Sequence, residues 1–178
     1  FKILDLAGGT GDIAKLLTSK IGKNGQLILS DYNQKMLKEG RDRLIDLGIN
    51  NISYAQIDAQ FLPFKKDSFD LITIAFGLRN FADKELSLKS IYQCLKPGGS
   101  LMVLEFSKPK NEILKELYDL YSFEVMPIIG SIVTNSAESY RYLAESIRMH
   151  PGQEELKKMF EKSNPKEEIN SYSKTIGK

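Results

Sequence analysis

The chain has 178 residues, the size of one domain that can bury a single sizeable core. Its composition, 42% hydrophobic and 27% charged, is that of a globular protein and excludes a disordered or fibrous one. The formal net charge is +2, without a basic stripe or interleaved aromatics, so we expect no nucleic-acid partner.

Cysteine usage and hydropathy limit the classes of protein to which the chain can belong. The single cysteine, Cys94, excludes a disulfide framework or a thiol cluster, so no metal site is expected. No apolar run approaches the roughly 20 residues that cross a bilayer. The chain opens at Phe1 inside a predicted strand and without a signal pattern, so we expect a piece of a longer, cytoplasmic protein.

Strands and helices alternate through the first two-thirds of the chain. Apolar runs predict strands at Lys2–Leu6, Gln26–Ser30, Ile52–Gln56, Phe69–Ala75 and Ser100–Phe106. Helical spacing predicts helices between them, at Asp12–Ile21, from an Asn33 N-cap to Gly48, and at Asp83–Leu95. This order implies βαβ units, and so a Rossmann-like α/β fold with a mostly parallel sheet covered by helices on both faces.

Three details of this pattern are specific enough to test. Leu37, Leu44 and Leu47 should form the buried face of the second helix, which Gly48 ends. Leu88, Tyr92 and Leu95 should share one side of the third helix. The Lys96–Gly99 segment, Lys-Pro-Gly-Gly, should then form a turn, since proline cannot continue a helix.

After Lys108 the pattern becomes helical. Helices are expected at about 112–126, 136–149 and 153–162, and residues 163–178 form a polar, lysine-rich tail. We therefore predict one domain over residues 1–162, followed by that tail.

A glycine-rich segment follows the first strand, where ligands bind in open parallel sheets. Its residues run from Asp5 through Gly9, Thr10 and Gly11 to Asp12. Residues 9–14 also fit the GxGxxA variant of the dinucleotide fingerprint, which would hold a pyrophosphate. Two carboxylates argue against that reading: Asp12 would repel a phosphate, and Asp5 suits a cationic amino-acid group, directly or through water.

Carboxylates also follow the second and third strands. Asp31 can accept both hydroxyls of a ribose, although a helix-capping role beside Asn33 is the alternative. Asp58 can bind an adenine amino group while the ring lies over Ala59, although a simple loop turn is the alternative. Asp70, at the start of the fourth strand, is interpreted as structural.

These residues together resemble the class I methyltransferases, and three further segments resemble one family within them. The segments are Phe76–Asn80 (FGLRN), Leu104–Pro109 (LEFSKP) and Tyr140–Pro151 (YRYLAESIRMHP). They are similar to signatures of the ubiquinone/menaquinone biosynthesis C-methyltransferase family, over Phe1 to about Phe160. The resemblance implies methylation of demethylmenaquinol or of a 2-methoxy-6-polyprenyl-1,4-benzoquinol, with S-adenosyl-L-methionine as the cofactor.

The resemblance also implies site residues. Cofactor positions carry over as Thr10, Asp31, Asp58 and Ala59, and a family position that is often serine falls on Ala75, which offers only a wall of the pocket. They join Asp5, Gly9 and Gly11 from the glycine-rich segment.

For the chemistry, we predict that Arg79 stabilises the quinolate oxygen or orients a water that takes its proton, with Asn80 sharing this role. The guanidinium is effectively always protonated and is a poor direct base. His150, the only histidine, is a candidate base with a suitable unperturbed pKa. Phe76, Tyr140 and Tyr142 are predicted to line the ring pocket. A structural role is the alternative for each.

The apolar segment Tyr118–Val133 is a candidate groove for the polyprenyl tail and a contact for the inner membrane surface, with a buried helical connection as the alternative. A quinone-biosynthesis complex is a further expected partner.

The chain departs from the family at both ends, because it lacks the N-terminal helices and the last strands that family members have. Two other functions stay open. The missing ends leave room for a non-catalytic cofactor-binding or scaffold protein of the quinone pathway, and the glycine-rich segment leaves room for an NAD(P)-dependent oxidoreductase.

Overall fold

The structure, a computed structural model, describes residues 1–22, 24–106 and 137–164. It contains two compact units, one formed by Phe1–Leu104 with Lys157–Lys178 and the other by Glu105–Leu156. The predicted helix at 112–126 and nearly all of the predicted tail lie outside the described residues. The single domain over residues 1–162 stays a prediction.

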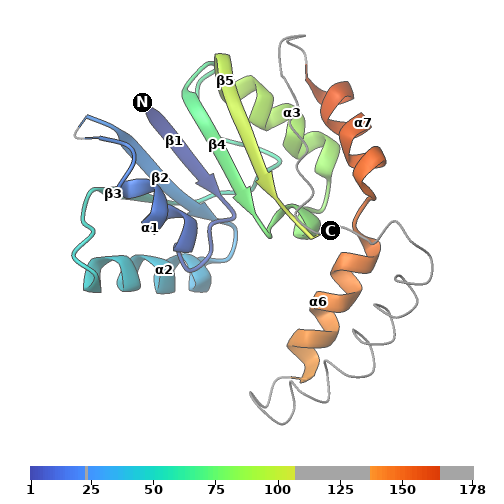
Figure 1. The fold of residues 1–178 in the computed structure, drawn as a ribbon, viewed down its shortest axis with the longest axis horizontal. Coiled ribbons are helices and arrows are strands. Elements are labelled where there is room, and N and C mark those ends of the chain that lie inside the picture. Colours follow the sequence, from blue (N-terminus) through green and yellow to red (C-terminus); the bar gives the residue numbers. More distant parts are fainter. Residues whose placement is uncertain (23, 107–136, 165–178) are drawn as a thin grey trace. The chain divides into compact units, whose positions relative to one another are not determined.

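The first unit is built on a five-stranded sheet in which every pairing is parallel (Figure 1). Its order is β3-β2-β1-β4-β5, with β1 at Lys2–Leu6, β2 at Gln26–Asp31, β3 at Ile52–Gln56, β4 at Phe69–Ala75 and β5 at Leu95–Leu104. The chain builds outward from β1 to β3 and then crosses to the other side of β1. That reversal places the topological switch point between β1 and β4. The predicted fold class is confirmed.

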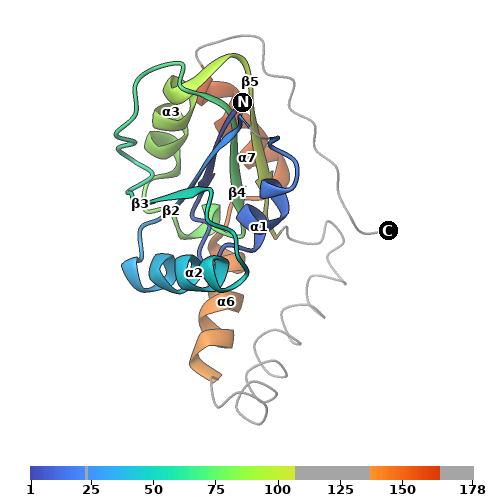
Figure 2. The ribbon, with the colours of Figure 1, turned by 90° about the vertical axis from the view of Figure 1, so that its left-hand side faces the viewer.

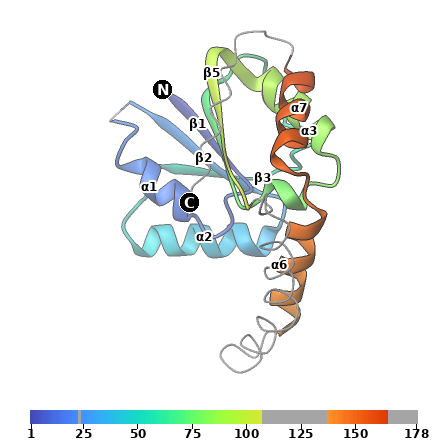
Figure 3. The same cartoon turned by 45° about the vertical axis from the view of Figure 1, so that its right-hand side comes forward.

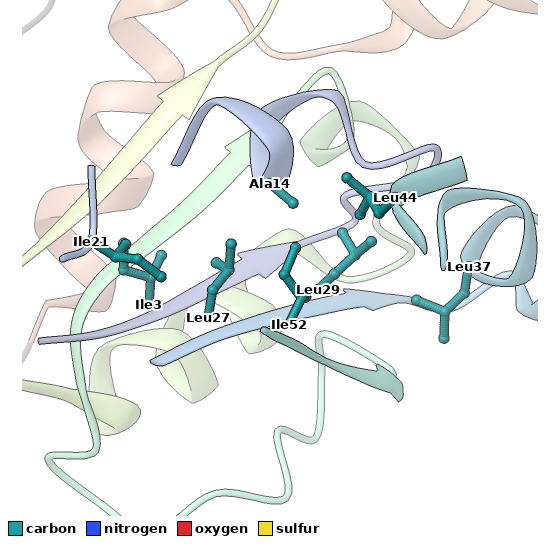
Figure 4. Close-up of a cluster of buried hydrophobic side chains, with 8 residues drawn as sticks. All are labelled: Ile3, Ala14, Ile21, Leu27, Leu29, Leu37, Leu44 and Ile52. Carbon is teal, nitrogen blue, oxygen red and sulfur yellow. The ribbon is translucent and has the colours of Figure 1, made fainter. Parts of the chain in front are cut away.

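Helices cover both faces of this sheet. α1 (Asp12–Thr18) and α3 (Lys84–Cys94) lie on opposite sides of the strands in the edge-on view of Figure 2. α1 and α2 (Gln34–Asp46) bury one apolar cluster against β1, β2 and β3, shown in Figure 4: Ile3, Ala14, Ile21, Leu27, Leu29, Leu37, Leu44 and Ile52. The opposite face packs on Leu88, Ile91 and Tyr92 of α3, which confirms the predicted buried side for Leu88 and Tyr92. Leu95 is also buried, but it is the first residue of β5 and not part of the helix.

The start of α2 is fixed by its N-cap, as the sequence predicts. The side chain of Asn33 accepts hydrogen bonds from the backbone N–H groups of Lys35 (2.9 Å) and Met36 (3.3 Å). Gly48 follows the helix with a φ of +76°, the left-handed conformation that ends many helices.

The buried face of α2 differs from the prediction at one position. Leu37 and Leu44 are buried, but Leu47 is 50% exposed, because the helix ends at Asp46 and Leu47 has left the helical stripe. Gly40 takes the missing place on the buried face.

The boundaries of two other elements also differ. α1 ends at Thr18 and not at Ile21, and a turn then carries Ile21 into the apolar cluster. β5 begins at Leu95, directly after α3, and ends at Leu104.

The predicted turn at Lys96–Gly99 is a bulge within β5. Leu95 lies opposite Phe69 and Ser100 lies opposite Leu71, so four residues of β5 face the single residue Asp70. Gly98 makes this possible with a φ of +73°, a conformation that most residues avoid.

Asp70 ties this end of the sheet together. Its carboxylate accepts the backbone N–H of Lys2 in β1 at 2.7 Å and the ammonium of Lys96 in β5 at 2.8 Å. The Lys96 ammonium and the Lys2 amide lower the pKa of Asp70. The predicted structural role is confirmed, although Asp70 joins three adjacent strands and lies on no sheet edge.

Two helices follow in the last part of the described chain. α6 (Ala137–Met149) belongs to the second unit and buries Ala144 and Ile147. α7 (Gln153–Ser163) enters the first unit at Lys157 and lies beside α3 there (Figure 3). In this part of the helix, Lys162 pairs with Glu85 of α3 at 3.0 Å. Among the described residues, no helix has both the length and the apolar character needed to span a membrane.

Candidate functional site

The glycine-rich loop after β1 lies against the carboxyl ends of its neighbouring strands. The N–H of Gly8 donates to the carbonyl oxygen of Ser30 in β2 at 2.9 Å, and the N–H of Gly11 donates to the carbonyl of Gly8 at 2.9 Å. Gly9 and Gly11 have φ values of +51° and +80°. A Cβ on Gly8 would lie 2.2 Å from the Cδ1 of Leu29, so any larger residue there would require the Leu29 side chain to move.

Helix α2 approaches the same loop through Gly40. A Cβ at this position would lie 2.4 Å from the carbonyl oxygen of Gly9 and 3.1 Å from the carbonyl carbon of Thr10. These are backbone atoms, so they cannot rotate away as a flexible side chain would. Sequence reasoning missed Gly40. Its signal is a glycine inside a helical pattern, which costs roughly 1 kcal/mol relative to alanine and points to a close approach.

Asp31 connects the loop to the start of α2. Its Oδ2 accepts the N–H of Gly9 at 2.9 Å, and its Oδ1 accepts the N–H of Asn33 at 2.8 Å. The N-cap of α2 is Asn33 and not Asp31. Asp31 instead braces the loop, because it links the backbone of Gly9 to that of Asn33. A carboxylate oxygen has more than one lone pair, and both oxygens of Asp31 keep capacity for further donors such as ribose hydroxyls.

The residues after β3 form a tight turn. Oδ1 of Asp58 accepts the backbone N–H of Gln60 at 2.9 Å, and the Asp58 carbonyl accepts the N–H of Phe61 at 3.1 Å. Ala59 is buried, while Phe61 is 69% exposed. Asp58 therefore does form the loop turn that was the alternative, and its binding of an adenine amino group stays a prediction.

Asp5 differs most from the expectation. It is completely buried, and its Oδ1 accepts the hydroxyl of Thr73 in β4 at 2.8 Å. Burial raises the pKa of Asp5 to about 6. The Thr73 hydrogen bond lowers this pKa in part, and the nearby Asp31 carboxylate raises it further. The Ala14 amide is close enough to lower the pKa again, but Oδ2 has no hydrogen-bond partner of normal geometry among the described residues. In this conformation Asp5 has no solvent-accessible surface for a direct ligand contact.

Asp12 and Thr10 form a small polar cluster at the start of α1. The Thr10 hydroxyl donates to Asp12 at 2.9 Å, and Arg43 of α2 pairs with the same carboxylate at 2.8 Å. The Thr10 hydroxyl and Arg43 lower the pKa of Asp12. Because Arg43 offsets its charge, repulsion by Asp12 is a weaker argument against a phosphate than the sequence implies.

The turn after β4 is the other half of the candidate site. Ala75 is partly buried, and Phe76 is 41% exposed with a φ of +55°. Ala7, after β1, has the same left-handed conformation at +56°, and a Cβ on Gly77 would lie 2.5 Å from the Ala7 Cβ. Two strained non-glycine residues therefore flank the switch point, and such strain clusters at functional sites.

Arg79 and Asn80 continue this turn as a short 3-10 helix, Leu78–Asn80. The Nη1 of Arg79 donates to the carbonyl oxygen of Phe76, and the Lys84 ammonium donates to the Arg79 carbonyl at 3.2 Å. Asn80 is exposed and Arg79 is partly exposed. The guanidinium is thus held at the carboxyl end of β4, as expected for a group that acts there.

The remaining predicted residues belong to the second unit. His150 is 3% exposed at the end of α6, and Tyr142 is 58% exposed. The side chain of Tyr140 and the segment Tyr118–Val133 lie outside the described parts of the chain. The predicted roles of these residues stay predictions.

The carboxyl edge of the first unit therefore brings together Asp5, Gly9, Thr10, Gly11, Asp31, Ala75 and Arg79 around the β1–β4 switch point, with Asp58 and Ala59 after β3. In the described part of the chain, no cluster of histidine, cysteine and carboxylate side chains is arranged to hold a metal ion. Carboxylates beside a close-packed glycine loop fit a ligand with hydroxyl, amino and cationic groups.

Several solved structures have the same fold as this chain. The YcgJ protein of Bacillus subtilis matches 91% of the chain and 60% of its own length, with a TM-score of 0.68 and 20% identity. A SAM-dependent methyltransferase from Aquifex aeolicus matches 62% of the chain and 59% of its own length, with a TM-score of 0.58 and 20% identity. At this identity the likeness establishes the fold alone.

Protein sequences give a narrower match. The ubiquinone/menaquinone biosynthesis C-methyltransferase of Methylococcus capsulatus is 60% identical over 163 residues, 91% of this chain and 66% of that protein. Its counterpart in Cellvibrio japonicus is 59% identical over 161 residues, 90% of this chain and 65% of that protein. The chain thus spans about two thirds of the length of these relatives. The model of the ubiE/COQ5 methyltransferase family matches residues 1–177, and this chain belongs to that family.

Proposed function

We propose that this chain is the core of an S-adenosylmethionine-dependent C-methyltransferase that methylates a ring carbon of a polyprenylated quinol. The acceptor is a demethylmenaquinol, a 2-methoxy-6-polyprenyl-1,4-benzoquinol, or both. The single observation that carries the proposal is the arrangement at the switch point. A glycine loop braced by Asp31 lies beside the turn that holds Arg79.

The cofactor is assigned to the β1 and β2 side of this edge. Asp31 is proposed to bind the ribose hydroxyls, and its existing hydrogen bonds to the N–H groups of Gly9 and Asn33 support this proposal. Asp58 is proposed to bind the adenine amino group, with Ala59 and the exposed Phe61 beside the ring. Gly9 and Gly11 allow close approach of the backbone, and Thr10 is adjacent to both. The Asp5 carboxyl acts on the cationic amino-acid end from beneath the loop.

The acceptor is assigned to the β4 side, with Phe76 as one wall of the ring pocket. S-adenosylmethionine supplies an electrophilic methyl group when it is bound. The chain must therefore make a ring carbon nucleophilic and hold it in line with that methyl group. Stabilising negative charge on the neighbouring quinol oxygen increases the electron density of the ring. Holding the reacting atoms in register can lower the barrier by about 7–11 kcal/mol in favourable systems.

Arg79 is proposed as the residue that stabilises this oxygen. Its hydrogen bond to the Phe76 carbonyl fixes the guanidinium at the carboxyl end of β4, and a guanidinium has several N–H donors for an oxyanion. Asn80, on the same turn, is a second donor. His150 is proposed as a proton acceptor, and Tyr140 and Tyr142 as further pocket residues. Contact of Tyr118–Val133 with a prenyl tail or a membrane surface is part of the same proposal.

The test is methyl transfer by the full-length gene product, assayed with short-chain demethylmenaquinol and with the corresponding methoxybenzoquinol. We expect transfer of a labelled methyl group to one or both quinols, and calorimetric binding of S-adenosylhomocysteine. Binding without transfer to either quinol would favour the scaffold function instead. Binding of neither ligand would contradict the proposal.

A further inference from the structure

Three neighbouring strands place a buried polar cluster directly under the glycine loop. Asp5 and Thr73 face each other in register on β1 and β4, and their side chains share a 2.8 Å hydrogen bond. Ser30 of β2 donates its hydroxyl to the carbonyl oxygen of Asp5 at 3.3 Å. All three residues are at most 3% exposed. Burying a polar group costs free energy unless it is hydrogen-bonded, so an incompletely bonded carboxyl near the ends of these strands requires an explanation.

The two oxygens of the Asp5 carboxyl have different surroundings. Oδ1 accepts the Thr73 hydroxyl, whereas Oδ2 is buried without a hydrogen-bond partner of normal geometry in the described part of the chain. Oδ2 also lies against the glycine loop, because a Cβ on Gly8 would be 2.8 Å from it. Thr73 therefore orients the carboxyl so that the oxygen nearest the loop is the one without a hydrogen bond of normal geometry among the described residues.

We propose that Thr73 is a positioning residue that aims Asp5 at the glycine loop, and that binding of the cationic amino-acid end of the cofactor releases a proton from Asp5. This inference rests on the proposed function. Below about pH 6 and before binding, the buried carboxyl is mostly neutral. A positive charge held by the loop favours the carboxylate, and the O–H bond of Asp5 breaks with loss of its proton to solvent.

The charged groups around Asp5 agree with this assignment. At the end of β2, Asp31 raises the pKa of Asp5, since two neighbouring carboxylates resist simultaneous ionisation. In α1, Asp12 is ion-paired with Arg43, and in β4 the carboxylate of Asp70 lies at the opposite, amino end of the strand. No described lysine or arginine has an ion pair with Asp5, so the arriving cation is its counter-charge.

The direction of the pH effect follows. The pKa of Asp5 is raised from 3.8 to about 6, so below pH 6 the carboxyl is mostly protonated and binding must displace the proton. The affinity for the ligand should fall by up to about tenfold per pH unit below that point, because one proton is lost. Well above pH 6 the carboxyl is already ionised, and the affinity should not depend on this group.

The test is isothermal titration calorimetry of S-adenosylhomocysteine on the full chain from pH 5 to 8, in buffers of different ionisation enthalpy. This ligand keeps the ammonium of the cofactor. We expect proton release below about pH 6.5, where the affinity also falls, and none near pH 8. The matched ligand 5′-methylthioadenosine lacks the amino-acid end and should bind without proton release.

Variants separate Thr73 from a merely structural role. Thr73→Val removes the hydrogen bond that lowers the pKa of Asp5, so its affinity loss should begin at a higher pH. Thr73→Ser keeps the hydroxyl and should restore the original profile. Asp5→Asn should flatten the profile and weaken binding at pH 8. Ser87→Ala removes another completely buried hydroxyl, bonded to the Asp83 carbonyl at 2.7 Å, and should leave the profile unchanged.

A second readout avoids dependence on the folding of Thr73→Val. The carboxyl carbon of Asp5, followed by NMR in the unliganded wild-type chain, should titrate near pH 6 and shift to a lower pH with S-adenosylhomocysteine. Binding that is independent of pH and of buffer would overturn the inference and leave the proposed function intact. No binding at any pH would overturn both.

Discussion

The two sides of the switch point are built in different ways. On the β1 and β2 side, backbone and carboxylate groups are locked together: Gly9 to Asp31, Gly8 to Ser30, and Gly40 against the Gly9 carbonyl. On the β4 side, Phe76 and Asn80 are exposed, and Arg79 is held at the Phe76 carbonyl. This difference is consistent with the proposed function, in which the cofactor side is pre-organised and the acceptor side presents groups to an incoming molecule.

Substituting Arg79 tests whether the two sides have separate roles, and it should have the largest effect. Arg79→Ala should lower methyl transfer by about 100-fold, the usual cost of removing a donor that stabilises an oxyanion, with the affinity for S-adenosylhomocysteine changed less than about twofold. Turnover and calorimetry on the same preparation check both parts. Arg41→Ala is the matched control, because Arg41 pairs with Asp42 on the exposed side of α2. Weaker cofactor binding with normal turnover would mean that Arg79 contributes to cofactor binding and does not stabilise the quinolate oxygen.

On the cofactor side, Asp31 should have the largest effect. Asp31→Ala leaves the N–H groups of Gly9 and Asn33 without their acceptor and would also remove the proposed ribose contact. The affinity for S-adenosylhomocysteine should fall on the order of 10- to 100-fold. Asp42→Ala, which removes only exposed ion pairs, should change it little. Equal affinity of Asp31→Ala and wild type would exclude a ribose-binding role.

A substitution at Gly40 tests whether close packing of α2 on the glycine loop matters, because it removes no polar group. In Gly40→Ala the new methyl group must displace the Gly9 carbonyl, and such overpacking costs about 1–3 kcal/mol. We expect a Tm several degrees lower and weaker cofactor binding, although alanine is the better helix former. Thermal unfolding and calorimetry measure these effects. Gly152→Ala, where an added Cβ meets no atom within 4 Å, is the control. A raised Tm in Gly40→Ala would mean that the Gly9–Thr10 backbone can move to accommodate the methyl group, and it would contradict a packing requirement for glycine.

The smallest effect is expected at the N-cap of α2. Asn33→Ala removes the acceptor for two backbone N–H groups and should lower the free energy of unfolding by about 1 kcal/mol, or the Tm by roughly 2–4 °C. The exposed Asn51→Ala, outside any helix, is the control for thermal unfolding. A similar loss in both variants would argue against a specific capping contribution.

The sequence was most informative where local patterns coincide with tertiary structure. β1, β3 and β4 have their predicted bounds, and the Asn33 cap and the parallel sheet are confirmed. Apolar periodicity and capping depend on near neighbours in the chain, so they can be read without the fold. Boundaries failed where two elements meet without a loop, as at the end of α3 and the start of β5.

The candidate site was predicted only as a set of residues, and their contacts were not. Nothing local shows that Asp5 is buried, that Thr73 lies opposite it 68 residues away, or that Arg43 pairs with Asp12. Gly40 and Thr73 were missed for the same reason. Thr73 has no distinguishing feature within its strand, and the glycine at position 40 of a helical pattern points to a close approach without showing which element approaches.

By itself the sequence determined the α/β class, the family motifs and the location of polar residues after each strand, because these depend on composition, period and chain order. Only the tertiary structure decided which carboxylates are open and which are buried. It also decided which glycines are required by close approach and which oxygen of Asp5 lacks a partner. Desolvation and packing depend on atoms that are distant in the chain, and they exist only once the sheet has formed.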